Sequence, residues 1–277
     1  MAKIRVGELD VHVQRMTAAG PPADGPPPLV VLVHGLLIDS LASYYFSLGP
    51  AFAERGMDVL MYDLRGHGRT GRPATGYRLE DFVADLDGLL DALGEDRPAH
   101  VVGNSFGGAI AYGLAAARPD RVRSVIAIES EPPVKSWAEK MAEGLTGEEG
   151  GLVVKEVRTW LAEDPERNAR PFQLAGDILD ATTLSEDIPR SRVLDDGLAD
   201  IRCPVFAVFG ADSKLAAQAS HLAATLGHCR TVVLPDQGHS VLVERTRETA
   251  ELLLEWLEDD IHDDTHDDIH TPAKGVR

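Results

Sequence analysis

A serine lies at the centre of a glycine-rich turn that joins an apolar run to a helix-like run. Residues 103–108 read Gly-Asn-Ser-Phe-Gly-Gly; Pro98–Val102 precede this turn and Phe106–Ala117 follow it. A sharp strand-to-helix turn exposes a serine hydroxyl for attack on a carbonyl, and its glycines let the strand and the helix approach closely. The amide of Phe106, at the start of the helix, is placed to hold negative charge on the attacked oxygen. We predict that Ser105 is a nucleophile and Phe106 an oxyanion donor.

A serine hydroxyl needs a general base within hydrogen-bonding reach, and histidine is the usual one. The chain has ten histidines. His239 is the best placed, because it follows an apolar run at Thr231–Leu234 and precedes the last predicted helix. In a parallel sheet covered by helices, functional loops gather at the carboxyl ends of the strands. We therefore predict His239 as the base.

The base needs a carboxylate that fixes its imidazole, and a second strand end supplies candidates. Asp212 follows the apolar run Val205–Phe209, which gives the order serine, aspartate, histidine along the chain. Glu129 and Glu131, just after the apolar run Val122–Ile128, also lie at the expected edge. We predict Asp212 as the acid and keep the two glutamates as alternatives.

The second oxyanion donor is expected from the loop after the apolar run Leu29–Val33. This loop begins His34-Gly35-Leu36-Leu37, and Gly35 lets the backbone pass close to Ser105. The amide of Leu36 is therefore the predicted donor beside that of Phe106. His34 is interpreted as structural. The run 62–70, Tyr-Asp-Leu-Arg-Gly-His-Gly-Arg-Thr, predicts a tight turn braced by Asp63 and Arg65, with no chemical role for His67.

The elements that position these residues alternate along the chain. Two alternating runs at the N-terminus predict an edge hairpin, and apolar strands then alternate with amphipathic helices. The predicted hairpin strands are Lys3–Leu9 and Val11–Met16; the later strands are Leu29–Val33, Val59–Tyr62, Pro98–Val102, Val122–Ile128, Val205–Phe209 and Thr231–Leu234. The predicted helices are Leu41–Arg55, Leu79–Leu93, Phe106–Ala117, Leu215–Leu226 and Glu244–Leu257. The fold class is α/β, with a mostly parallel eight-stranded sheet flanked by helices.

Residues 131–199 interrupt the alternation and predict a helical cap inserted into a core of residues 1–130 and 200–258. The cap contains apolar side chains that either form its own core or line a substrate pocket beside Ser105: Trp137, Met141, Trp160 and Phe172. Residues 259–277 repeat acidic residues and histidines without an apolar face, which predicts a disordered, solubilising tail.

Composition and charge restrict the partners. The chain has 277 residues, 44% of them hydrophobic, and a net charge of -18. This charge disfavours nucleic acid and anionic membrane surfaces, so the expected partner is a small-molecule substrate. The N-terminus lacks the apolar core of a signal peptide, and no apolar stretch is long enough to span a bilayer. We expect a cytoplasmic monomer or homodimer.

These motifs together resemble the α/β-hydrolase superfamily over residues 1 to about 258. The resemblance rests on His34-Gly35, the turn from Asp63 to Gly68, and the ordered acid and base. It also rests on the sharp strand-to-helix turn at Gly103–Gly107 that carries Ser105, which we call the elbow. The amino-acid sequence of the elbow, Gly-Asn-Ser-Phe-Gly-Gly, also resembles that of carbon–carbon bond hydrolases that cleave ring-fission products. This chain departs from them by carrying Leu36–Asp39 where they usually have Ser-Gly-Pro-Gly, and Ser240 where they usually have tryptophan.

The resemblance and the residues imply a hydrolase that needs neither a cofactor nor a metal. The expected substrate is an ester or thioester of a small to mid-sized apolar acyl compound. The alternatives on the same residues are carbon–carbon cleavage, acyl transfer or elimination. A protein that uses the pocket only to bind a ligand is the non-enzymatic alternative.

Overall fold

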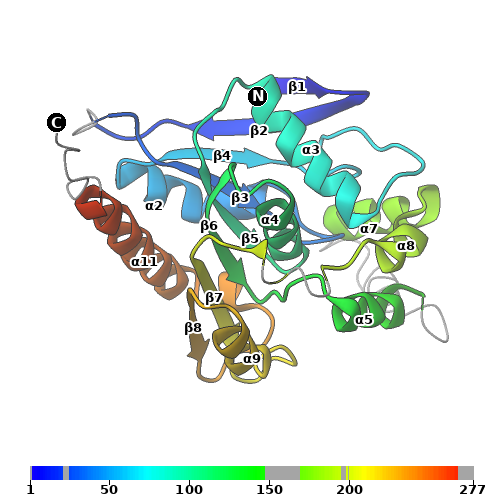
Figure 1. Ribbon diagram of the computed structural model, residues 1–277. Helices are drawn as coiled ribbons and strands as arrows, with labels where there is room; N and C mark the ends of the chain where they lie inside the picture. Colours follow the sequence, from blue (N-terminus) through cyan, green and yellow to red (C-terminus); the bar gives the residue numbers. More distant parts are fainter. Residues whose placement is uncertain (1, 21–24, 147–168, 195–197, 199, 268–277) are drawn as a thin grey trace, which may run out of the picture.

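An eight-stranded sheet forms the centre of the computed structural model, which describes residues 2–20, 25–146, 169–194, 198 and 200–267 (Figure 1). The strands are β1 (Ala2–Val6), β2 (Leu9–Met16), β3 (Leu29–Val33), β4 (Asp58–Tyr62), β5 (Ala99–Asn104), β6 (Val122–Ile128), β7 (Val205–Gly210) and β8 (Cys229–Leu234). Their order across the sheet is β1-β2-β4-β3-β5-β6-β7-β8. The eight-stranded α/β sheet predicted from the sequence is confirmed.

The sheet combines an antiparallel edge with a parallel centre. β1 pairs antiparallel with β2, and β2 pairs antiparallel with β4. From β4 through β3, β5, β6 and β7 to β8, every pair of neighbours is parallel. The carboxyl ends of these six strands therefore lie along one edge, which is where the predicted catalytic residues follow their strands.

Helices cover both faces of the sheet. The described helices are α1 (Ala42–Tyr45), α2 (Leu48–Glu54), α3 (Leu79–Ala92), α4 (Phe106–Ala117), α5 (Lys135–Thr146), α7 (Ala169–Ala181), α8 (Leu184–Asp187), α9 (Gln218–Thr225), α10 (Val241–Glu244) and α11 (Thr246–Asp267), with a 3₁₀ turn at Ile188–Arg190. Helices α3, α4 and α9 lie on one face, and α2 and α11 lie on the other (Figure 1).

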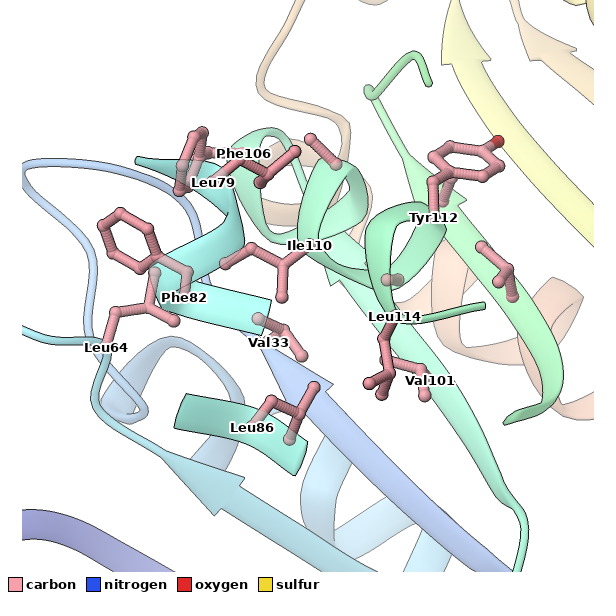
Figure 2. Close-up of a cluster of buried hydrophobic side chains, with 14 of the residues drawn as sticks. Val33, Leu64, Leu79, Phe82, Leu86, Val101, Phe106, Ile110, Tyr112 and Leu114 are labelled. Atoms are coloured by element: carbon pink, nitrogen blue, oxygen red, sulfur yellow. The ribbon is translucent and has the colours of Figure 1, made fainter. Parts of the chain in front are cut away.

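The period-two pattern of the strands divides the core between the two faces. Along β3, Leu29, Val31 and Val33 join one buried cluster, whereas Val30 and Leu32 join the other. All five side chains are buried, so the strand is a continuous apolar run rather than an alternating one. Figure 2 shows the first cluster, in which side chains of α3 and α4 pack together above β3 and β5. This packing fixes α4 and hence the turn that carries Ser105.

The predicted helix Leu41–Arg55 is two helices, because Pro50 interrupts it. In a continuous helix the Pro50 ring would clash with the carbonyl of Phe46, and its missing N–H would leave that carbonyl without a donor. The chain bends at Ser47, whose φ of -124° and ψ of -95° are not helical, and α2 then begins at Leu48. Pro50 thereby falls in the first turn of α2, where an N–H is not needed.

Helices α5, α7 and α8 are inserted between β6 and β7, where the sequence predicts a cap. They lie beyond the carboxyl edge of the sheet (Figure 1). The division into core and cap at residues 131 and 199 remains a prediction. At the C-terminus, α11 continues through Asp267, whereas the sequence predicted disorder from Asp259. No helix among the described residues is long and apolar enough to cross a membrane.

Candidate active site

Ser105 occupies a strained turn between β5 and α4. Its φ of 52° and ψ of -119° lie outside the regions that residues with a side chain prefer, and its N–H donates to the Ile128 carbonyl at 2.9 Å. Glycine is required on both sides of it. A Cβ on Gly103 would lie 2.3 Å from the Gly107 backbone, and one on Gly107 would lie 2.1 Å from the Val33 carbonyl oxygen. The elbow predicted from the sequence is therefore present.

His239 lies beside the serine, and its second ring nitrogen meets a carboxylate. His239 Nε2 is 3.1 Å from Ser105 Oγ, and His239 Nδ1 is 2.9 Å from Glu129 Oε2. The carboxylate accepts from Nδ1–H, which leaves Nε2 free to accept the serine proton. The His239 side chain is 55% exposed, whereas that of Glu129 is fully buried. This chain of two hydrogen bonds has the geometry of a nucleophile, a general base and an orienting acid.

The end of β7 and the loop after it supply two further donors to the Glu129 carboxylate. The Gly210 N–H donates to Oε1 at 2.5 Å, and the Ser213 hydroxyl donates to Oε2 at 2.6 Å. The Glu129 backbone is left-handed, with a φ of 49°, and its N–H donates to the Val208 carbonyl. These two donors and the burial of the side chain fix the carboxylate beside His239.

The sequence prediction of Asp212 as the partner of His239 is corrected by this geometry. Asp212 is exposed, its N–H donates to the Gln237 carbonyl, and no hydrogen bond among the described residues joins its side chain to His239. The strand end that Asp212 follows contributes donors instead, through Gly210 and Ser213. Strand position alone does not separate the two acids, because β6 and β7 are neighbours and end at the same edge.

Glu131, the other alternative acid, has a different partner. Both of its carboxylate oxygens lie 2.7 Å from Lys140 Nζ on α5. Its side chain is 5% exposed and that of the lysine is 44% exposed. Glu131 therefore ties α5 to the end of β6, two residues after Glu129.

The predicted oxyanion loop is a strained turn whose central amide is bound by His67. The Ile38 N–H donates to the Leu36 carbonyl at 3.0 Å across Leu37, whose φ is 68°. A three-residue turn of this handedness is rare and strained. The Leu37 N–H donates to His67 Nε2 at 2.9 Å, so the turn is held from outside. A Cβ on Gly35 would lie 3.6 Å from the Asn104 carbonyl, which places the loop against the elbow. The role of Leu36 remains a prediction.

His34 and His67 hold the loops after β3 and β4 together as neutral side chains. The Leu64 N–H donates to His34 Nε2, and the Nδ1–H of His67 donates to the Arg65 carbonyl. Burial and, to a smaller extent, the neighbouring His34 together lower the pKa of His67 to about 3; burial also lowers the pKa of His34. A neutral imidazole retains the unprotonated nitrogen that these amides require. Nothing in the sequence indicated that His67 contacts the predicted oxyanion loop, since the two residues in contact are 30 positions apart.

Asp63 and Arg65 brace the turn after β4, as predicted. The Asp63 carboxylate accepts the N–H groups of Leu41 and Arg69, and Arg65 binds Asp85 through two nitrogens at 2.6 Å.

The four predicted pocket residues have different outcomes. Trp137 is 4% exposed and stacks on Phe106 at 6.2 Å between ring centroids, so it packs in the core beside the elbow. Met141 is half-buried against the same core. Trp160 lies outside the described residues, and Phe172 lies in α7, where its side chain is not described. Their contact with a substrate remains a prediction.

The sheet order, the inserted helices and the strained serine elbow define the α/β-hydrolase fold. A family model described as alpha/beta hydrolase fold matches residues 28–147. The enol-lactonase from Burkholderia xenovorans LB400 superposes with a TM-score of 0.70 at 23% identity, over 91% of this chain and 98% of that one. The chain therefore has the α/β-hydrolase fold, and the part of it from residue 28 to residue 147 matches the family model.

Two curated relatives match part of the chain. Epoxide hydrolase B of Mycobacterium tuberculosis is 39% identical over 112 residues, which cover 38% of this chain and 31% of that protein. The 2-hydroxy-6-oxo-2,4-heptadienoate hydrolase of Pseudomonas putida is 41% identical over 124 residues, which cover 44% of this chain and 42% of that protein. The chain thus spans less than half the length of these relatives.

Proposed function

We propose that this protein is a serine hydrolase that cleaves an ester or thioester of a small to mid-sized apolar acyl compound. One observation carries the proposal: the continuous hydrogen-bonded chain from Glu129 through His239 to Ser105. A serine that donates to an imidazole, which in turn donates to a buried carboxylate, is equipped for acyl transfer.

The reaction proceeds in two halves. Ser105 Oγ attacks the substrate carbonyl while His239 Nε2 takes the hydroxyl proton, and the oxyanion binds the amides of Leu36 and Phe106. Collapse of this intermediate breaks the bond to the alcohol or thiol, which leaves with the proton from His239. Water then attacks the acyl-serine, His239 takes its proton, and the acid is released as the proton returns to Ser105. Glu129 stays ionised and stabilises the imidazolium in both halves.

The test is hydrolysis of 4-nitrophenyl butyrate by the wild type and by Ser105→Ala. We expect the variant to lose about 10³-fold or more in kcat, because the nucleophile is gone. A fluorophosphonate should add one phosphonyl group to the wild-type chain at Ser105 and none to the variant, as read by intact-protein mass spectrometry. Ester hydrolysis retained by Ser105→Ala would refute the role of the serine.

A second candidate is hydrolysis of a carbon–carbon bond on the same residues. The amino-acid sequence around Ser105 and the sequence identity to the Pseudomonas putida hydrolase favour this candidate. The discriminating measurement is rapid-quench mass spectrometry during turnover of a 2-hydroxy-6-oxo-dienoate and of a nitrophenyl ester. Faster turnover of the dienoate than of any ester would replace the first proposal by the second.

A further inference from the structure

One oxygen of the Glu129 carboxylate receives two hydrogen bonds, and only one of them comes from the base. His239 Nδ1 lies 2.9 Å from Glu129 Oε2, and the Ser213 hydroxyl lies 2.6 Å from the same oxygen. The other carboxylate oxygen, Oε1, accepts the Gly210 N–H at 2.5 Å. The Ser213 hydroxyl is therefore bonded to the oxygen that meets the imidazole, whereas the Gly210 amide is bonded to its neighbour.

The partners of the Ser213 hydroxyl fix the direction of its proton. Among the described residues, two groups are hydrogen-bonded to its oxygen: the Glu129 carboxylate and the Leu215 N–H at 3.1 Å. The ionised carboxylate only accepts hydrogen bonds, and the amide only donates. The hydroxyl proton therefore points at Glu129, and a lone pair of the hydroxyl oxygen accepts the Leu215 amide.

The main chain around Ser213 is tied to the loop that carries His239. The Ser213 N–H donates to the Gly210 carbonyl at 3.1 Å, and the Asp212 N–H donates to the Gln237 carbonyl at 2.8 Å. A Cβ on Gly210 would lie 2.2 Å from the Gln237 carbonyl oxygen, so the loops after β7 and β8 are in direct contact. The position of the Ser213 hydroxyl is thus fixed relative to both the acid and the base.

The charge of Glu129 depends on these donors. Its side chain is fully buried, and a buried carboxylate that has lost its hydration needs hydrogen-bond donors to stay ionised. A hydroxyl that donates to the ionised form stabilises the negative charge. Without this donor, the carboxylate and the imidazole bonded to it would hold a proton more tightly.

The other charged side chains close to these loops in sequence are exposed or paired. Asp212 and Lys214 flank Ser213, and Asp236 and Glu244 flank His239; all four are exposed, so solvent screens their charges. Glu131 is paired with Lys140. A change at Ser213 leaves all of these charges in place.

We propose that Ser213 is a positioning residue of the proposed triad: its hydroxyl orients the Glu129 carboxylate toward His239 and stabilises its negative charge. This role rests on the proposed function, because it concerns the activation of Ser105. No hydrogen bond among the described residues joins Ser213 to Ser105 or His239, so Ser213 acts through Glu129.

The test is the rate at which a fluorophosphonate labels Ser105, which requires the triad but not the natural substrate. Ser105 Oγ bonds to phosphorus, fluoride leaves, and His239 takes the hydroxyl proton. Intact-protein mass spectrometry gives the second-order rate constant, which should fall at low pH as His239 becomes protonated. In Ser213→Ala we expect the plateau rate constant to drop about tenfold and this acidic limb to move up by about half a pH unit to one unit. Both changes are the size expected for one lost hydrogen bond to a charged group.

Three further variants isolate the hydroxyl. Ser213→Thr keeps it and should stay within about twofold of the wild type, with the acidic limb unmoved. Ser213→Cys keeps a similar size but is a weak donor, so its limb should move upward by a smaller amount; this variant decides the matter if Ser213→Ala does not fold. Ser220→Ala, on exposed α9, removes a serine hydroxyl away from the acid and should match the wild type.

The outcomes separate this role from the proposed function. An acidic limb that stays in place in both Ser213→Ala and Ser213→Cys would overturn the positioning role; lower stability to urea alone would assign Ser213 to the turn at Leu215. Failure of Ser213→Thr to keep the wild-type limb would overturn it as well. If Ser105 of the wild type takes up no label at any pH, the proposed function fails, and the role of Ser213 fails with it.

Discussion

Two groups of histidines lie at the same edge of the sheet and differ in almost every physical respect. His239, in the loop after β8, has a side chain that is 55% exposed and hydrogen bonds to a serine and a carboxylate. His34 and His67, in the loops after β3 and β4, are buried and accept backbone N–H groups. In the first arrangement, the imidazole can accept a proton from the serine hydroxyl and return it. The second keeps the ring neutral, so that its unprotonated nitrogen can hold a turn. The role of a histidine at this edge of the sheet, catalytic or structural, therefore follows from its burial and its hydrogen-bond partners rather than from its position after a strand.

The largest effect should separate the two candidate acids. Glu129→Gln keeps the shape of the side chain but removes the charge that fixes the tautomer of His239, so kcat for 4-nitrophenyl butyrate should fall by about 10³–10⁴-fold. Asp212→Asn is the matched control and should change kcat by less than about twofold. The same loss in both variants, or a loss only in Asp212→Asn, would restore the acid predicted from the sequence.

A smaller effect should follow from removing the neutral histidine behind the oxyanion loop. His67→Phe takes away the acceptor of the Leu37 N–H, so the strained turn relaxes and the amide of Leu36, the proposed oxyanion donor, moves. We expect kcat to fall about 10²-fold with little change in KM, and the free energy of unfolding to fall by about 1–3 kcal/mol. His67→Gln retains an acceptor and should recover part of kcat. Its failure to do so, with stability restored, would separate His67 from catalysis.

A third effect concerns stability in acid. Burial and the charge of Arg123 lower the pKa of His100 to about 3, and burial and His34 do the same for His67. The unfolded chain binds these protons at its ordinary pKa near 6.5, so the unfolded state holds more protons between pH 6.5 and 3. Stability should therefore fall with decreasing pH in this window, by about 1.4 kcal/mol per pH unit for each histidine.

Urea denaturation of the wild type and of His100→Gln at pH 7, 6 and 5 measures this effect. The variant has no titrating group at this position, so its stability should decline less steeply, even though it loses the hydrogen bond to Ser124 at 2.8 Å. Parallel declines in the two proteins would show that His100 is not protonated on unfolding in this range.

The smallest effect belongs to the ion pair that anchors α5. Lys140→Met removes the partner of Glu131, and because the lysine is 44% exposed, solvent screening limits the loss to about 1 kcal/mol or less. Activity on a small ester should stay within about twofold, since neither residue contacts the serine or His239. Thermal denaturation and the ester assay check both statements. A large loss of activity would mean that Glu131 contributes to the site beyond tying down a helix.

The sequence was sufficient for the sheet, the elbow and the base, because these depend on local patterns: apolar runs, glycines beside Ser105, and a histidine just after a strand. It was insufficient for the acid. Glu129 and Asp212 both follow neighbouring parallel strands, and the choice between them rests on a left-handed backbone at Glu129 and on donors from Gly210 and Ser213. Gly210 and Ser213 are 81 and 84 positions away from Glu129 along the chain, and contacts over such separations leave no pattern in a single sequence. The hydrogen bond between Leu37 and His67, which are 30 positions apart, likewise leaves no pattern in the sequence.

The position of Glu129 in the chain also determines where the inserted helices can be exchanged for those of another protein. The acid lies before the inserted helices, and the groups that hold it, Gly210 and Ser213, lie after them. The segment between Glu131 and β7 is therefore a cassette whose exchange leaves the acid, the base and the nucleophile in place. A chimaera that receives a foreign cap should keep residues 129–131 of the recipient, since a junction before Glu129 would replace the acid along with the inserted helices.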